Sequence, residues 1–233
     1  MFMTFASSWP RLARLLLASV LLATPAFANT DREDDLAGEA VEVLRNIMDT
    51  PDHRIPDSLL RDAEAIAVIP HVVKAGLVFG GRHGRGLLSV RMRDGVWSNP
   101  IFISLTGGSV GFQAGVESTD VILVFRTRRG VDSVVNGKFT LGADASVAAG
   151  PVGRSAAMST DQKLEAEIYS YSRSRGLFAG VSLDGSALRV RERSNARVYG
   201  RDITPRRILE GGTRGAPETV VAFRDLLEES TSR

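Results

Sequence analysis

Hydrophobic residues follow a helical spacing near both ends of the chain. Over 31–50 the apolar positions fall on one helical face, and acidic residues crowd the first turn. A short second helix is predicted over 56–64, with Pro56 near its start. Val220, Phe223 and Leu227 share one side of an amphipathic tail. The pattern therefore predicts helices at the N- and C-terminal ends of the fold.

Between these helices the apolar residues follow the spacing of β-strands. Six short apolar segments follow at even intervals, separated by glycine, proline and an Asp-Gly pair. They cover 65–70, 75–80, 86–92, 99–105, 109–116 and 120–125. Asp94-Gly95 marks the clearest hairpin turn. We therefore predict an α+β fold, with a curved antiparallel, barrel-like sheet flanked by N- and C-terminal helices.

The first 28 residues have the order of a secretory signal peptide. Arg11 and Arg14 precede an apolar run over 15–23, and Ala26-Phe27-Ala28 provides a cleavage site. This run is shorter than the roughly 20 residues of a spanning helix. We predict cleavage after Ala28 and a single domain over 29–233, with its core at about 59–200 and a C-terminal helix at about 217–229. An uncleaved N-terminal anchor is the alternative.

The composition excludes some classes of chemistry and indicates the charge of a binding partner. The chain has no cysteine, which excludes thiol and iron–sulfur chemistry. Residues 29–65 carry a net charge of −7, whereas 66–209 carry +9, nearly all of it from arginine. Arginine favours planar, bidentate contact with carboxylate or phosphate, so a basic body suggests an anionic partner. A solvated surface balanced by the acidic N-terminal segment is the alternative.

A search for catalytic motifs predicts no enzyme. Residues 107–111 satisfy G-x-S-x-G, but His53, His71 and His83 all precede Ser109, so a structural turn is expected there. The glycines satisfy neither a P-loop nor G-x-G-x-x-G. The histidines are too scattered for a metal site, and the arginines lack the interleaved aromatics of a nucleic-acid site. We expect no catalytic residue, cofactor, metal or nucleic-acid partner.

The segment 74–90 is the best candidate for an anion site. Its glycines at 80, 81, 84 and 86 allow positive φ and exposed N–H groups in a turn. The basic residues expected to ring this turn are Lys74, Arg82, His83 and Arg85. A second cluster of basic residues, and the fallback site, is formed by Arg126, Arg128 and Arg129. A surface hairpin with solvated arginines is the alternative.

Four stretches together resemble the SYLF family, which is also called the Ysc84 actin-binding-like family. They are 65–91, 97–125, 137–154 and 168–185, within a likeness that runs from about 59 to 200. The resemblance implies lipid binding and no enzymatic activity; eukaryotic members bind phosphoinositides, and some bind or bundle actin. In eukaryotic members an N-terminal amphipathic helix contributes to membrane contact, but the polar face of this helix is acidic here and should be repelled by anionic lipid.

The expected protein is an exported bacterial member of this family, periplasmic or secreted and peripheral at a membrane. It is expected to be non-enzymatic and to contact anionic phospholipid headgroups through the basic glycine-rich turn. Actin is not expected as a partner in a bacterial envelope. The alternative function is an envelope module that binds another protein.

Overall fold

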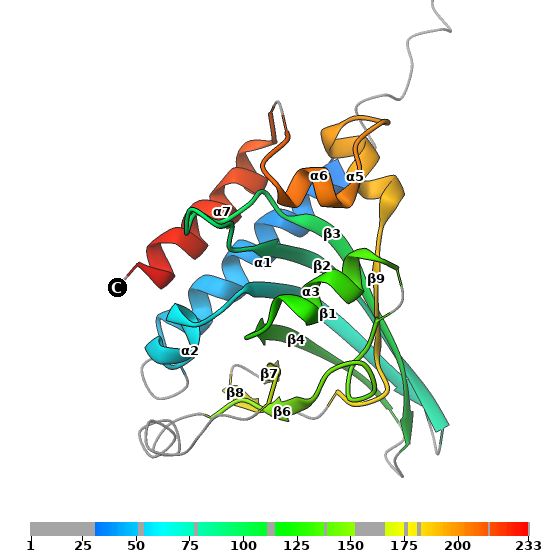
Figure 1. Ribbon diagram of the computed structural model, residues 1–233. Coiled ribbons are helices and arrows are strands. Elements are labelled where there is room, and N and C mark those ends of the chain that lie inside the picture. Colours follow the sequence, from blue (N-terminus) through cyan, green and yellow to red (C-terminus); the bar gives the residue numbers. More distant parts are fainter. Residues whose placement is uncertain are drawn as a thin grey trace, which may run out of the picture.

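The fold is α+β, with one strongly curled sheet and helices packed against both of its faces (Figure 1). The computed structural model describes residues 31–50, 54–76, 79–110, 115–137, 139–151, 166–174, 177–180, 183–213 and 215–232. The predicted fold class, with helices at both ends of a barrel-like sheet, is confirmed. The predicted signal peptide, 1–28, lies outside the described residues.

Most of the described helices lie toward the two ends of the chain, and most of the strands lie between them. The helices are α1 (Asp31–Met48), α2 (Asp57–Arg61), α3 (Arg128–Val135), α5 (Glu192–Tyr199), α6 (Pro205–Leu209) and α7 (Glu218–Thr231). The strands are β1 (Ala65–Gly76), β2 (Phe79–Val90), β3 (Ile101–Val110), β4 (Gly115–Phe125), β5 (Phe139–Thr140), β6 (Val147–Ala149), β7 (Ile168–Ser174), β8 (Leu177–Gly180) and β9 (Ala187–Val190).

The strands form one sheet in the order β5-β9-β3-β2-β1-β4-β7-β6, with β8 paired to β7. All described pairs are antiparallel except β6 with β7, which is parallel. The sequence had predicted an antiparallel sheet, and the parallel pair of β6 with β7 is the exception to that prediction. Its four longest strands, β1 to β4, extend beyond the helices at one end (Figure 1).

Apolar side chains cover both faces of the sheet, because successive side chains of a strand point to opposite faces. One core packs β-strand residues such as Val68 and Leu87 against α1 and α7, which lie side by side (Figure 1). The other core lies on the opposite face, where residues such as Leu88 pack against α3 and α6. We call these faces the α1 face and the α3 face. The apolar stripe of α1, including Leu44, is fully buried in the first core.

The glycine-rich stretch is a strand, so the predicted basic turn is wrong. Residues 79–90 form β2, and none of its glycines has a positive φ. A Cβ on Gly86 would lie 2.1 Å from the carbonyl oxygen of Val68, and one on Gly84 would lie 2.7 Å from Val72. The register of β1 shifts in this region, where His71 has a φ of 48°. Glycine at 84 and 86 therefore makes room for the β1 bulge.

Residues 107–110 also lie in a strand, although a structural turn was expected there. Ser109 belongs to β3 and pairs with Gly80 of β2. A nucleophile elbow places its serine on a sharp turn between a strand and a helix. The extended backbone at Ser109 does not have that geometry.

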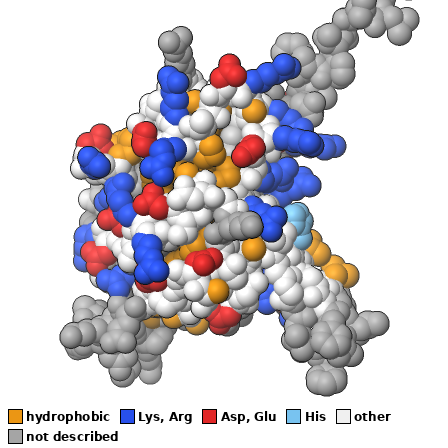
Figure 2. Space-filling model, turned by 45° about the vertical axis from the view of Figure 1, so that its right-hand side comes forward, with side chains coloured by type: hydrophobic (Ala, Val, Ile, Leu, Met, Phe, Trp, Pro, Cys, Tyr) orange, Lys and Arg blue, Asp and Glu red, His pale blue; other side chains and the backbone are white. Residues whose placement is uncertain are grey.

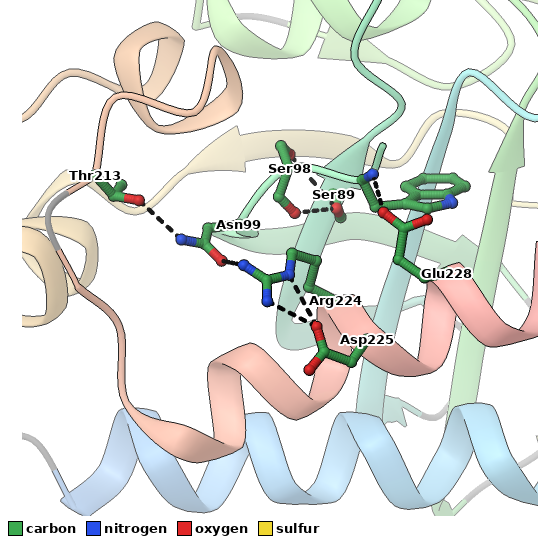
Figure 3. A network of polar contacts seen from close by, with 8 residues as sticks. Ser89, Ser98, Asn99, Thr213, Arg224, Asp225 and Glu228 are labelled. Carbon is green, nitrogen blue, oxygen red and sulfur yellow. Dashed lines mark hydrogen bonds and ion pairs between the residues drawn. The ribbon is translucent and has the colours of Figure 1, made fainter. Parts of the chain in front are cut away.

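A polar network fixes α7 to the connection between β2 and β3 (Figure 3). Arg224 of α7 donates a hydrogen bond of 3.2 Å to Asn99, which donates one of 2.8 Å to Thr213. Glu228 accepts from the backbone N–H of Trp97, and the indole N–H of Trp97 donates to the Thr231 hydroxyl at 2.8 Å. Because Trp97 is fully buried, this network holds the C-terminal helix in place.

Candidate anion-binding groove

An arginine-rich groove of about 700 Å³ lies on the α1 face. It runs between the first turns of α1, the bulge of β1, the middle of β2 and the start of α5. We call it the arginine groove. Its basic lining residues are Arg32, His71, His83, Arg85, Arg191 and Arg197. Its acidic lining residues are Glu33, Asp35 and Glu39.

Three neighbouring strands and one helix bring the cations together. Arg85 of β2 pairs with Ser104 of β3, which pairs in turn with Arg189 of β9. These partners share one face of the sheet because directly opposed residues point to the same side. Arg191 follows β9, and its N–H donates to the Phe102 carbonyl at 2.8 Å. The short helix α5 begins at the next residue and carries Arg197 into the same groove.

One arginine of the groove is neutralised by a buried acid. Arg197 donates a hydrogen bond of 3.0 Å to Oε1 of Glu33, which is only 4% exposed. The Oε2 atom of Glu33 has no hydrogen-bond partner among the described residues. This ion pair joins the first turn of α1 to α5, and its role is therefore structural.

Two other arginines of the groove, Arg85 and Arg191, form no ion pair among the described residues. Partial burial, and then the guanidinium of Arg85, lower the pKa of Arg191, and the Glu33 carboxylate opposes this shift. Arginine keeps its charge even so. Two close guanidinium groups that repel one another gain free energy when an anion lies between them.

Histidines form the outer rim of the groove. His83 is exposed and lies on β2, two residues from Arg85 and on the same face. His71 lies 3.5 Å from Glu39 through Nδ1, and its backbone N–H donates to Asp120 at 3.1 Å. Glu39 therefore lies on the His71 side of the groove, whereas Glu33 lies on the side of Arg191 and Arg197.

The four residues of the predicted turn are divided between the two faces. His83 and Arg85 line the arginine groove. Lys74 and Arg82 lie directly opposite one another in β1 and β2, on the α3 face. Glu117 of β4 is the other neighbour of Lys74 in the sheet. Because strand side chains alternate, residues 82 and 83 cannot point to the same place.

The fallback cluster contributes to a second groove, of about 680 Å³, on the α3 face. Arg128 lines it, forms an ion pair of 2.9 Å with Glu64 and donates to the carbonyl of Arg91. On the same groove, Arg206 lies 3.9 Å from Asp132. We call it the α3 groove. Of the three arginines that line it, Arg128 and Arg206 are paired with acids, and Arg93 forms none of the ion pairs described.

The other two members of the fallback cluster do not line this groove. Arg126 is half-buried and its backbone N–H donates to the Glu167 carbonyl at 2.8 Å. Arg129 is exposed in the first turn of α3. Of the three, only Arg128 therefore lines the α3 groove.

Reasoning from the sequence missed Arg32, Arg191 and Arg197 in the arginine groove. A usable signal was present, because arginine occurs at 189, 191, 193, 197 and 201. Alternation over 187–191 would have placed Arg189 and Arg191 on one face. The contribution of α1 could not be seen, since 32 and 85 are far apart in the chain and meet only through the fold.

Features of other site classes were also sought among the described residues. Within the described parts of the chain, no three histidine, aspartate or glutamate side chains gather as metal ligands would. None of the described helices combines the length and the hydrophobicity that crossing a bilayer requires.

Comparison with known proteins identifies relatives. The family model Ysc84, described as "Las17-binding protein actin regulator", matches residues 106–230. The chain is 41% identical over 178 residues to LAS seventeen-binding protein 3 of Saccharomyces cerevisiae, covering 75% of this chain and 39% of that protein. It is 36% identical over 183 residues to human SH3 domain-containing YSC84-like protein 1, covering 76% and 53%. The chain thus spans about half of these relatives or less.

Proposed function

The chain belongs to the Ysc84 family, also called the SYLF family, and we propose that it is a non-enzymatic domain that binds anionic phospholipid headgroups in its arginine groove. The observation that carries this proposal is that Arg85 and Arg191 line one groove and that neither forms an ion pair among the described residues. A phosphate diester or monoester is the ligand that two neighbouring guanidinium groups bind best, through paired N–H donors.

The relatives support the absence of catalysis in this proposal. Their names describe proteins that bind Las17 or that contain an SH3 domain, and none of those names describes an enzyme. We further propose that the chain is exported by its N-terminal segment and acts at the surface of an envelope membrane. The signal-peptide pattern of 1–28 supports this location.

The packing of α1 argues against this helix as the part of the domain that contacts lipid. Its apolar residues Ala40, Leu44 and Ile47 are fully buried against the sheet and α7. Asp34 also accepts a 3.1 Å hydrogen bond from Thr219 of α7. Inserting α1 into a bilayer would expose this core, so the groove and not the helix is the proposed contact.

Vesicle co-sedimentation with a double variant tests the proposal. Changing Arg85 and Arg191 together to alanine should lower affinity for vesicles rich in phosphatidylglycerol by at least about tenfold, since each cation near an anionic membrane contributes on the order of 1 kcal/mol. Binding of the unchanged protein should fade as salt rises. The matched control is Arg128→Ala with Arg206→Ala, which removes the same charge from the α3 groove and should change affinity less than about twofold.

Equal losses in both double variants would show that the protein responds only to net charge, and would remove the groove from the proposal. The melting temperature of each variant reports whether its fold is intact. A second candidate function, binding of a protein partner, is favoured by the names of the Las17-binding relatives. It predicts no sedimentation with vesicles of any composition.

A further inference from the structure

The α1 face of the sheet continues past the arginine groove, where none of the described helices covers it (Figure 1). Here the exposed side chains are apolar or small. Val73 is 41% exposed and Val116 is 77% exposed, and Ala75 lies between them in the sheet. We call these three residues the bare strand end. Large apolar side chains this exposed are few, since Val96 is the only other such residue in the described parts of the chain.

Strand pairing places the bare strand end on the same face as the groove. Val73 pairs with His83, and Ala75 pairs with both Gly81 and Val116. His83 and Arg85 therefore lie on one line of β2 that leads outward to Gly81 beside Ala75. In Figure 2, basic side chains gather along one edge of the molecule, a histidine lies below them, and hydrophobic side chains lie below the histidine.

Charged residues lie around the bare strand end, but none of them belongs to it. Lys74 and Arg82 occupy the other face of the same strands, and Glu117 is beside Lys74 there. Asp120 lies on the α1 face, nearer the helices, where Arg173 of β7 is its partner in the sheet. Among the described residues at this end of the α1 face, Val73, Ala75 and Val116 are joined by glycine and by the exposed Ser118 beside Val73, and the cations of the groove lie behind them.

We propose that the bare strand end enters the apolar layer of a bilayer while the arginine groove holds a headgroup, an inference that rests on the proposed function. Depth supports it. The four residues from Arg85 to Gly81 span roughly 13 Å at about 3.3 Å per residue. The headgroup region of one leaflet is only about 5–8 Å thick. With Arg85 at the phosphates and the strands pointing inward, Val116 reaches the acyl chains.

A bilayer fits this surface better than a second copy of the chain does. Three small side chains offer far less area than the roughly 800 Å² that each partner contributes to a stable protein interface. The bare strand end is also continuous with the arginine groove, so pairing two copies of the chain through it would bring like charges together. An anionic membrane satisfies both the cations and the apolar tip.

The chain has no cysteine, so a single introduced cysteine carries a label at one known place. Val116→Cys is labelled with an environment-sensitive nitrobenzoxadiazole dye and mixed with phosphatidylglycerol vesicles that contain lipids with a quencher on the acyl chain. We expect a blue shift and at least twofold quenching. Val96→Cys is the matched control, because Val96 is 44% exposed but lies beside the Asp94-Gly95 turn, at the opposite end of β2. Its emission should not change.

A second variant measures the energetic contribution. Val73→Ser with Val116→Ser keeps every charge and should lower vesicle affinity at least about fivefold at high salt, where the apolar contact dominates. Its melting temperature should stay within a few degrees, because both residues are exposed. Unchanged affinity at high salt, together with an unquenched label at 116, would overturn the inference.

The results separate this inference from the proposed function. Vesicle binding without quenching at 116 leaves the headgroup site standing and removes the insertion. Absence of any vesicle binding removes both. A label at 116 that becomes buried without vesicles, as protein concentration rises, assigns the bare strand end to a second copy and also overturns the insertion.

Discussion

The arginine groove and the α3 groove are nearly equal in volume, about 700 and 680 Å³, and lie on opposite faces of the sheet. Both contain several arginines and several acids. They differ in how those charges are arranged. Arg128 and Arg206 of the α3 groove are each paired with an acid, whereas Arg85 and Arg191 of the arginine groove form none of the described ion pairs, and Arg85 lowers the pKa of Arg191.

In the proposed function, pairing, and not the number of cations or the volume, is what separates the arginine groove as a binding site from the α3 groove as a charged surface. A paired arginine already binds a carboxylate of the protein, and an external anion must compete with that carboxylate. Two arginines that repel each other offer free donors and gain from the arrival of an anion. The ion pairs within each groove are therefore the place to test the comparison.

The largest effect is expected at the buried ion pair of the arginine groove. Changing Arg197 to alanine leaves the Glu33 carboxylate buried without its partner, which should lower the free energy of unfolding by about 2–3 kcal/mol, below the range for a fully buried pair because Arg197 is partly exposed. In the α3 groove, Arg128→Ala breaks an exposed pair with Glu64 and should cost less than about 1 kcal/mol. Urea unfolding measures both.

Adding Glu33→Gln to the Arg197→Ala variant tests the cause of that loss. The double variant removes the isolated charge and should recover part of the stability. If the Arg197 and Arg128 variants lose equal stability, the two grooves do not differ in burial of charge as the structure indicates.

The glycines of β2 give the next largest effect. Gly86→Ala should destabilise the protein by about 1–3 kcal/mol, because its Cβ would press on the backbone of Val68. Gly108→Ala is the control in the neighbouring strand, where the structure has nothing within 4 Å of an added Cβ, and it should cost almost nothing. Thermal unfolding compares them. A Gly86 variant of normal stability that no longer binds vesicles would restore the idea of a phosphate-binding turn.

Local pattern was sufficient to predict most of the fold. Helical spacing predicted α1 and α7, and alternation predicted the long strands, because both patterns reflect burial against a neighbouring layer. The error at 79–90 has a physical cause. A glycine is needed both where φ is positive and where another backbone approaches closely. The composition of β2 is the same in both cases, and only the bulge of β1 distinguishes them.

The candidate site was predictable only in part. His83 and Arg85 were identified because they lie in one conspicuous stretch, but Lys74 and Arg82 beside them point to the other face. Arg191 was missed because it belongs to a different strand connection. The pairing of β3 with β9 brings it to Arg85, and such long-range pairing is not encoded in the spacing of either segment.

The smallest expected effect is a gain of binding in the α3 groove. Changing Glu64 and Asp132 to glutamine and asparagine frees Arg128 and Arg206 while it preserves the shapes of the side chains. In the background of Arg85→Ala and Arg191→Ala, this change should restore affinity for phosphatidylglycerol vesicles by about three- to tenfold, since each freed cation contributes on the order of 1 kcal/mol. Both pairs are exposed, so stability should change by less than about 1 kcal/mol. Co-sedimentation at low salt measures the gain. If affinity does not rise, unpaired charge alone does not make a site, and the position of Arg85 and Arg191 together in one groove becomes the deciding feature.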